Sequence, residues 1–383
     1  MPPLTRGSTE KAVGAREGPA EPGECLVELD KALELDASDV TVRCGSTPLY
    51  RVARRCEKAG EVTTEKNWRA LLKKALPNGA KESNEQELGG FEYRESRWRA
   101  AYYGSSKGRV LELRRIRTRR RRPKEYGIPE KFFEVVAHAR KTGGLLLVTG
   151  PMGTGKSTTL AAAIDFLNEL DDLKIQTLED PIENIMEDGR CTFFANEYGQ
   201  DFLEWPKAIK DVLRRDADVL VIGELQDKAI MEAAITAAET GLLVMATLHT
   251  RTAAGAVTRL TDALKDQTDL LSKLGSNFLG VLAQQLVRAD GPKGDKKLVG
   301  AYEFLGRTTA VVNLIREGRT ELLAHEIATG KRAGMVMLDD SLVKLVEERR
   351  VLAATACEHA TDRAAMEKRL GVAQSPSRDR GSS

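Results

Sequence analysis

The chain has 383 residues, 41% hydrophobic and 30% charged, which is typical of a globular protein long enough for two domains. No apolar run approaches the roughly 20 residues of a membrane span, and the polar residues 1–24 lack an export signal, so we expect a cytoplasmic protein with a disordered leader. The formal net charge of +2 and five scattered cysteines without a CxxC pair give no indication of a nucleic acid partner, a zinc site or a disulfide framework.

Residues 25–118 predict a small α+β domain. Its first expected elements are two helices and two short strands, at residues 26–35, 64–75, 40–42 and 49–52. Further on, Trp98, Ala100 and Tyr102 alternate with other residues before a glycine-containing turn at 104–108. This alternation on both sides of a turn indicates a β-hairpin.

Residues 119–128 are expected to form a basic linker, because this stretch is arginine-rich and contains Pro123. After the linker, helical segments alternate with short Val, Leu and Ile runs, which is typical of a largely parallel sheet covered by helices. The expected helices are 129–141, 157–168, 206–214, 228–240 and the closing segment 342–368. The expected strands are 145–149, 175–178, 219–222 and 243–248. We assign this α/β domain to residues 129–360 and a helical end with a polar tail to residues 361–383.

The strongest motif is GPMGTGKS at 150–157, which fits the phosphate-binding pattern G-x-x-x-x-G-K-[ST] between an apolar strand and a helix. The glycines let backbone N–H groups surround phosphates, and the start of the helix adds the positive end of its dipole. Lys156 should reach the β- and γ-phosphates of ATP, and the hydroxyl of Ser157 should hold Mg²⁺. The expected nucleotide-binding residues are Gly150, Pro151, Met152, Gly153, Thr154, Gly155, Lys156, Ser157 and Thr158.

Three further polar groups follow expected strands, at the edge where open α/β sheets bind ligands. Glu224, at the end of DADVLVIGE, could orient and activate the water that attacks the γ-phosphate, although a standard Walker B motif has Asp where Gly223 stands. His249 in TLHT could sense the γ-phosphate by hydrogen bonding. A surface carboxylate and a buried structural histidine are the simpler interpretations. The stretch TLEDPIE supplies three carboxylates that could hold Mg²⁺ or its waters, or form only a charged loop: Glu179, Asp180 and Glu183.

Together these segments resemble the secretion-ATPase superfamily and, within it, the type IV pilus retraction ATPases. GPMGTGKSTTLAA corresponds to the Walker A box, TLEDPIE to the Asp box, LRRDADVLVIGE to the atypical Walker B box and AAETGLLVMATLHT to the His box. The resemblance covers about residues 26 to 360. It includes LDASDVTVRCGSTPLYRV in the first domain and TGKRAGMVMLDDSLVKLVEERRV near the end of the second.

The resemblance implies a RecA-like P-loop ATPase domain joined by a flexible linker to a smaller PAS-like N-terminal domain, with ATP between them. It implies a homohexamer that hydrolyses Mg-ATP. Arg99 and Arg114 match the N-terminal arginines that reach the γ-phosphate, although solvated surface arginines are the simpler interpretation. The implied catalytic residues are Glu183, Glu224 and His249, with Glu183 and Ser157 also placed to hold Mg²⁺ directly or through water.

The function implied by the resemblance is pilus retraction, and hence twitching motility, through an inner-membrane platform protein that holds the enzyme at the inner membrane face. ATPases of type IV secretion or conjugation systems remain an alternative. Pilus assembly and type II secretion ATPases fit less well. Many of them are longer and carry a four-cysteine metal module, which this sequence lacks. The seven arginines between Arg114 and Arg122 leave a nucleic-acid translocase open, but a linker explains them equally, so no stable nucleic acid binding is expected.

Three positions depart from the family pattern. Leu242 replaces a histidine of the His box, Gln226 replaces an arginine after the Walker B box, and Val312 replaces the arginine of the C-terminal AIR signature. The departures at Leu242 and Gln226 keep a non-hydrolysing regulatory or scaffold ring open as an alternative. We also hypothesise that Leu242 exchanges a polar coupling element for apolar packing.

Overall fold

The computed structural model describes residues 26–52, 55–76, 87–94, 96–117, 123–184, 186–294 and 297–372. The chain divides between Arg117 and Thr118 into two compact units, close to the boundary expected at residue 118. The expected leader 1–24, the arginine-rich residues 119–122 and the last residues of the polar tail, 373–383, lie outside the described residues.

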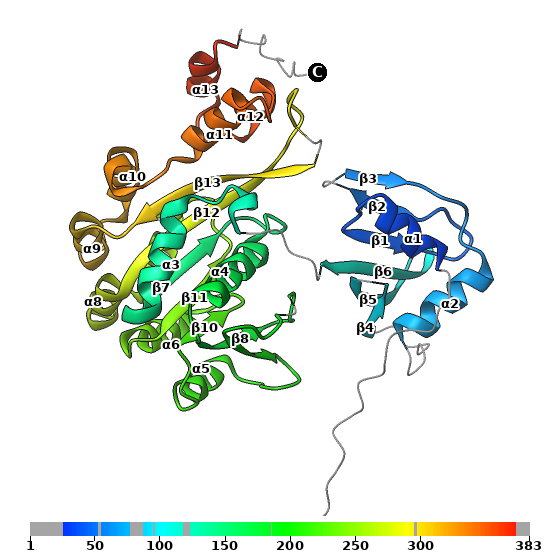
Figure 1. Cartoon of the computed structure of the whole chain (residues 1–383), viewed down its shortest axis with the longest axis horizontal. Helices are drawn as coiled ribbons and strands as arrows, with labels where there is room; N and C mark the ends of the chain where they lie inside the picture. Colours follow the sequence, from blue (N-terminus) through cyan, green and yellow to red (C-terminus); the bar gives the residue numbers. More distant parts are fainter. Residues whose placement is uncertain are drawn as a thin grey trace, which may run out of the picture. The chain divides into compact units, whose positions relative to one another are not determined.

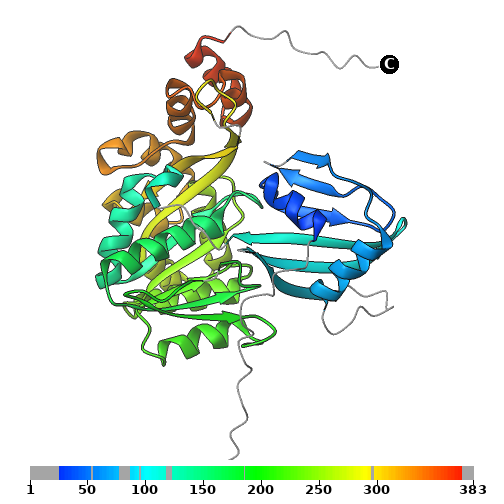
Figure 2. The same cartoon turned by 45° about the vertical axis from the view of Figure 1, so that its right-hand side comes forward.

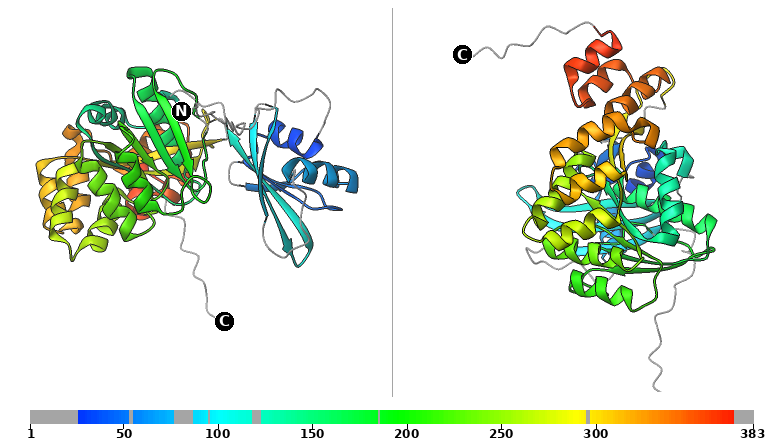
Figure 3. Two further views of the ribbon diagram at one scale, coloured as in Figure 1. Left: turned by 90° about the horizontal axis from the view of Figure 1, so that it is seen from below. Right: turned by 90° about the vertical axis from the view of Figure 1, so that its left-hand side faces the viewer.

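The described part of the first unit is a six-stranded antiparallel sheet in the order β3-β2-β1-β6-β5-β4 (Figure 1). Helices α1 and α2 cover one face of this sheet (Figure 3, left). Their apolar residues pack on inward-facing Trp98 and Leu113, whereas Arg97 and Glu112 of the same strands are exposed. The elements are α1 Val27–Glu34, β1 Asp39–Val42, β2 Leu49–Val52, β3 Arg55–Lys58, α2 Glu65–Ala75, β4 Glu87–Tyr93, β5 Ser96–Ser105 and β6 Gly108–Arg117.

The described part of the second unit contains a seven-stranded sheet in the order β13-β12-β7-β11-β10-β8-β9. Every neighbouring pair is parallel except β12 with β13. This confirms the RecA-like α/β fold class, with the antiparallel unit as the smaller PAS-like domain. The strands are β7 Gly144–Thr149, β8 Lys174–Glu179, β9 Thr192–Glu197, β10 Val219–Ile222, β11 Leu243–Leu248, β12 Phe278–Arg288 and β13 Leu298–Gly306.

Alternating side chains of the buried strands face two different cores. Leu146 and Val148 of β7 point to the core under α3 Glu130–Thr142 and α4 Lys156–Leu170, which lie on one face of the sheet (Figure 2). Leu145 and Leu147 point to the opposite core. The helices that contribute to this second core are α5 Trp205–Leu213, α6 Lys228–Glu239, α7 Ala253–Leu264, α8 Thr268–Asn277, α9 Thr309–Arg316 and α10 Leu323–Thr329.

The C-terminal helices gather around the far end of the β12–β13 hairpin, where they share a small core with Val287 and Val299 (Figure 3, right). We predicted one helical segment over residues 342–368, and the structure corrects this to three helices. The first break contains Arg349 in the left-handed region (φ 61°), which a continuous helix cannot contain. The three helices are α11 Leu338–Glu347, α12 Ala353–His359 and α13 Arg363–Leu370.

The end of the expected linker is also corrected. Residues Pro123–Tyr126 form a 3-10 turn. Tyr126 and Ile128 pack on the core of the second unit, and the hydroxyl of Tyr302 donates a hydrogen bond to the Tyr126 carbonyl at 3.0 Å. Residues 123–128 therefore belong structurally to the second unit.

Helices in the part of the chain that the structure describes are all too short or too polar to cross a bilayer. The cysteines within the same part, Cys44, Cys56, Cys191 and Cys357, are free thiols.

Candidate active site

The loop between β7 and α4 has the backbone shape of a phosphate cradle. Gly150, Gly153 and Gly155 have φ values of 153°, 70° and 86°. A Cβ atom on Gly150 would lie 2.5 Å from the main-chain oxygen of Gln284, so only glycine fits. Gly155 is the N-cap of α4, and the first-turn N–H groups of a helix have no intrahelical partner. The loop and this helix start together favour an anion.

Gln284 holds this loop from the neighbouring strand β12. Its side chain is 2% exposed, and its Nε2 donates to the Thr154 carbonyl at 2.7 Å. Its Oε1 accepts from the Thr159 hydroxyl at 2.8 Å. One amide therefore ties the loop to the first turns of α4, which stiffens the cradle. The sequence analysis missed this residue because it did not predict β12.

Lys156 is buried beneath the loop. Its Nζ donates to the Gly150 carbonyl at 2.9 Å and the Pro151 carbonyl at 3.3 Å, and lies 3.2 Å from Nδ1 of His249. Burial lowers the pKa of Lys156, while the negative charges of Glu224 and Glu183 oppose the shift. An ammonium group that has lost much of its hydration gains more from a phosphate oxygen than a solvated one does.

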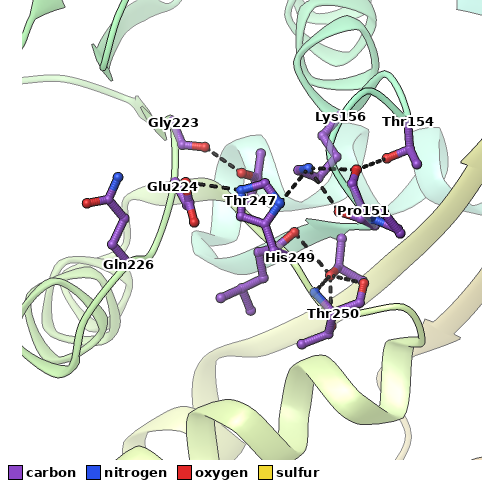
Figure 4. Close-up of polar contacts among 12 residues, drawn as sticks. Pro151, Thr154, Lys156, Gly223, Glu224, Gln226, Thr247, His249 and Thr250 are labelled. Carbon is purple, nitrogen blue, oxygen red and sulfur yellow. Dashed lines mark hydrogen bonds and ion pairs between the residues drawn. The ribbon is translucent and has the colours of Figure 1, made fainter. Parts of the chain in front are cut away.

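His249 links Lys156 to Glu224. Nε2 of His249 lies 3.1 Å from Oε2 of Glu224, and the two side chains are 33% and 30% exposed. They stand at the carboxyl ends of neighbouring parallel strands, β11 and β10 (Figure 4). Three residues proposed from separate motifs thus lie in one contact chain, Lys156–His249–Glu224.

A threonine pair joins the P-loop strand to the loop that carries His249. The Thr250 N–H donates to Oγ1 of Thr149 at 3.0 Å, and the two hydroxyl oxygens are 2.8 Å apart. The Thr247 hydroxyl donates to the carbonyl of Gly223, directly before Glu224 (Figure 4). These bonds fix the ends of β7, β10 and β11 relative to one another.

Two carboxylates of the Asp-box segment, Glu179 and Glu183, differ in burial and in hydrogen bonding. Glu179, at the end of β8, accepts from the Thr177 hydroxyl at 2.8 Å and from the Glu183 main-chain N–H at 3.2 Å. Burial raises the pKa of Glu179. Glu183 is exposed, and its main chain is held by the partly buried Glu179.

A cavity between α4 and the ends of β8 and β10 adjoins the P-loop. Its polar lining consists of Ser157, Thr177, Glu179 and Asn184, and its apolar lining comes mainly from α4. The Asn184 side-chain amide donates to the Ser157 carbonyl at 3.4 Å. Glu179, which we had considered only as one of three carboxylates, therefore lines the same cavity as Ser157. Strand-end position alone did not distinguish it from Glu183.

Arg99 and Arg114 lie in the first unit on neighbouring strands, as direct cross-strand partners of β5 and β6. Nε of Arg114 donates to Oδ1 of Asp39 at 2.8 Å, and Arg51 approaches the same carboxylate at 3.7 Å. The arginines thus share one face of the sheet with a carboxylate that orients Arg114. Their expected contact with a nucleotide stays a prediction.

The three departures from the family pattern have different surroundings. Leu242 is 5% exposed and packs in the core that contains residues of α6 and α7. This apolar packing agrees with the hypothesis. The effect of Leu242 on coupling between subunits stays a prediction. Gln226 is exposed, and its main-chain carbonyl accepts from Arg259 at 3.2 Å. Val312 is buried on α9.

Two relatives and one solved structure show what this chain is similar to. It is 39% identical over 257 residues to the uncharacterised protein YggR of Escherichia coli K12, covering 67% of this chain and 77% of that one. It is 37% identical over 253 residues to the type IV pilus retraction ATPase PilT of Pseudomonas aeruginosa, covering 66% and 72%. The crystal structure of the pilus retraction motor PilT with bound ADP superposes with a TM-score of 0.74 at 30% identity, covering 90% of this chain and 98% of that one.

The family model described as type II/IV secretion system protein matches residues 91–374, which include β5 and β6 of the first unit and all of the second unit's named elements. The match contains the phosphate cradle, the Lys156–His249–Glu224 contact chain and the Asp-box segment. The chain belongs to the type II/IV secretion system protein family.

Proposed function

We propose that this chain is the motor of type IV pilus retraction, which converts the hydrolysis of Mg-ATP into removal of pilin from the pilus base. The chain is an ATP-hydrolysing, nucleotide-binding enzyme of its family. The observation that carries the proposal is the contact chain Lys156–His249–Glu224 at the carboxyl edge of the sheet. The likeness to a pilus retraction motor over 90% of this chain supports retraction as the work performed.

Nucleotide binding begins at Lys156. In the structure its ammonium group contacts two loop carbonyls and His249. Phosphate oxygens are stronger acceptors for an ammonium group than neutral carbonyls, because both partners are then charged. We expect the β- and γ-phosphates to replace these contacts, with the N–H groups of the loop and of α4 binding the remaining oxygens.

Hydrolysis then depends on Glu224 and His249. Glu224 would orient the attacking water and accept its proton, which requires a carboxylate within hydrogen-bond reach of that water. Once phosphate takes the place of His249 on Lys156, the imidazole is released to contact the γ-phosphate. His249 would thereby connect the arrival of nucleotide at Lys156 with the position of Glu224.

The residues present fit Mg²⁺, which prefers hydroxyl, carboxylate and water oxygens. The Ser157 hydroxyl stands at the start of α4, and Ser157 and Glu179 line one cavity beside the P-loop. Ser157 would hold the ion directly, and Glu183 would hold it directly or through water. When bound, the ion would neutralise charge on the phosphates.

The assembly expected for this motor is a homohexamer at the inner membrane face, held there by an inner-membrane platform protein. Arg99 and Arg114 would supply positive charge to the γ-phosphate, and Asp39 would orient Arg114 for this contact. Size analysis of the full chain by light scattering should give six subunits. A fully active monomer would contradict the ring.

The test of retraction is deletion of the gene in its own host, with surface pili stained and twitching motility scored. Excess pili without motility, restored by the wild-type gene but not by Lys156→Ala, is the expected result. Missing pili would indicate assembly instead, and normal pili would indicate a secretion system.

A further inference from the structure

Glu303 is a buried carboxylate outside the Walker A, Asp, Walker B and His boxes. It lies in β13, an apolar strand, and is 5% exposed. The Ala253 N–H, at the first position of α7, donates to its Oε1 at 2.7 Å. The N–H group of Leu338, at the first position of α11, favours the charged form of this carboxylate. The side chain is thus bonded to the start of α7 and faces the start of α11.

The two helix starts explain how a carboxylate can be accommodated at this depth. First-turn N–H groups lack intrahelical partners, and helix N-termini favour negative charge. Burial raises the pKa of Glu303, and the N–H groups of Ala253 and Leu338 oppose this shift. The strand itself is fixed to the segment before α11, because Phe304 and Val336 exchange main-chain hydrogen bonds at 2.8 and 3.1 Å.

The helix α7 begins four residues after His249. The connecting loop is held at one side by the Thr149–Thr250 pair at the end of the P-loop strand. At the other side Thr252 caps α7 by accepting from the Gly255 N–H at 3.0 Å, and Ala253 is bound to Glu303. The loop with His249 is therefore short and fastened at both ends.

We propose that Glu303 is a positioning residue for ATP hydrolysis: by fastening the start of α7 to β13, it holds His249 where it contacts both Lys156 and Glu224. The inference rests on the proposed role of His249 in hydrolysis. It assigns the C-terminal strand β13 a part in the geometry of a site whose motifs lie on β7, β8, β10 and β11.

Two substitutions separate this role from general destabilisation. Glu303→Gln keeps the size of the side chain but removes its negative charge, so the Ala253 N–H at the start of α7 loses a charge-assisted hydrogen bond and keeps at most a weaker neutral one. Ala253→Pro removes the other partner of the same bond. The backbone accepts proline at the first helical position, because the preceding Thr252 already has the extended conformation that proline requires (φ −125°, ψ 157°). The proline ring takes the place of the N–H group and displaces the Glu303 carboxylate from the start of α7.

Asp290→Asn is the matched control. Asp290 accepts from the Leu352 N–H at 3.0 Å and from the Thr355 hydroxyl at 2.7 Å at the start of α12, so the change likewise turns a helix-capping carboxylate into an amide. Nothing in its contacts involves the loop that carries His249. The Asp290→Asn variant therefore shows how weaker hydrogen bonding in the C-terminal region alone changes kcat.

The experiment measures kcat and KM for Mg-ATP hydrolysis by the full chain in the wild type, the three variants and His249→Ala. Glu303→Gln and Ala253→Pro are each combined with His249→Ala. We expect the single variants Glu303→Gln and Ala253→Pro each to lower kcat about tenfold, because small misplacements of reacting groups slow catalysis strongly. KM should change less than about twofold. In the His249→Ala background both should have less than about a twofold effect, because residues that act through one group are not additive.

An equal loss of kcat in both backgrounds would overturn the inference, because Glu303 would then act independently of His249. An equal loss in Asp290→Asn, or an unchanged kcat in Ala253→Pro, would overturn it as well. If Glu303→Gln fails to fold, the Ala253→Pro cycle decides alone. An inactive wild-type enzyme would contradict the proposed function itself, and with it the inference, whereas an active enzyme insensitive to both variants contradicts the inference alone.

Discussion

Two regions lie at adjacent strand ends of one sheet, yet they hold their charged residues in different ways. One is the cluster of Lys156, His249 and Glu224, and the other is the Asp-box segment. Lys156, His249 and Glu224 contact one another through their side chains. In the Asp-box segment, Glu183 is exposed and only its main chain is held, by the carboxylate of Glu179. A cluster of mutual side-chain contacts is ordered before substrate arrives, whereas an exposed carboxylate is positioned through its backbone. Substitutions should therefore have larger effects in the cluster.

The largest effect is expected for Lys156→Ala. This change removes the ammonium group that opposes the phosphate charges. The Thr154 hydroxyl also donates to the Pro151 carbonyl, but it is uncharged and cannot replace the ammonium group. Binding of a fluorescent ATP analogue should be lost within the measurable range, together with hydrolysis. Unchanged nucleotide affinity would mean that the loop binds phosphate without Lys156.

Glu224→Gln should separate binding from turnover. Glutamine keeps the shape of the side chain and can still hydrogen-bond to His249, but it cannot accept a proton from water. We expect ATP binding to be retained and kcat to fall by about 10²–10⁴-fold, the range for loss of a general base. Near-normal hydrolysis by Glu224→Gln would remove Glu224 as the base.

Sequence patterns predicted the four parallel strands of the sheet centre well. Strands β7, β10 and β11 are short and mostly apolar, and β8 leads directly into the TLEDPIE segment. The P-loop was equally accessible, since its glycine and lysine spacing is imposed by the backbone shape that phosphate requires. The strands that were missed have other compositions. The edge strand β9 is only partly covered, and β12 and β13 are longer strands with a polar residue near the middle, Gln284 and Glu303.

Gln284 and Glu303 show why part of the site could not be predicted. Each is buried in a strand because it bonds main-chain groups far away in sequence, Thr154 and Ala253. No local pattern distinguishes such a residue from an exposed polar side chain. Which of Glu179 and Glu183 lines the cavity beside Ser157 could not be predicted for a related reason: the depth of a carboxylate depends on what α4 covers, not on its distance from the strand.

A smaller effect is expected for Leu242→His, which tests whether the cluster depends on the opposite end of β11. Leu242 is 5% exposed within the core, so the change removes burial that contributes about 1.5–3 kcal/mol for a leucine and adds a polar ring. We expect the free energy of unfolding to fall by about that amount in denaturant titration. A gain in ATPase rate or cooperativity would instead support the hypothesis that this residue exchanges coupling for packing. Gln226→Arg is the control, because Gln226 is exposed and the change should stay within about 0.5 kcal/mol.

The smallest effect is a change of pH dependence, expected for Glu179→Gln in the Asp-box segment. Burial raises the pKa of Glu179 above its ordinary value of 4.5, so the folded protein binds this proton more tightly than the unfolded chain. The contribution of Glu179 to the free energy of unfolding is therefore fully present below about pH 4.5 and is lost as pH rises through the folded pKa. Glutamine does not titrate, and it fits the same partners because the Thr177 hydroxyl can accept as well as donate. Denaturant titrations from pH 4.5 upward should show the wild type losing stability relative to Glu179→Gln, and parallel curves for the two proteins would show that burial does not raise the pKa of Glu179.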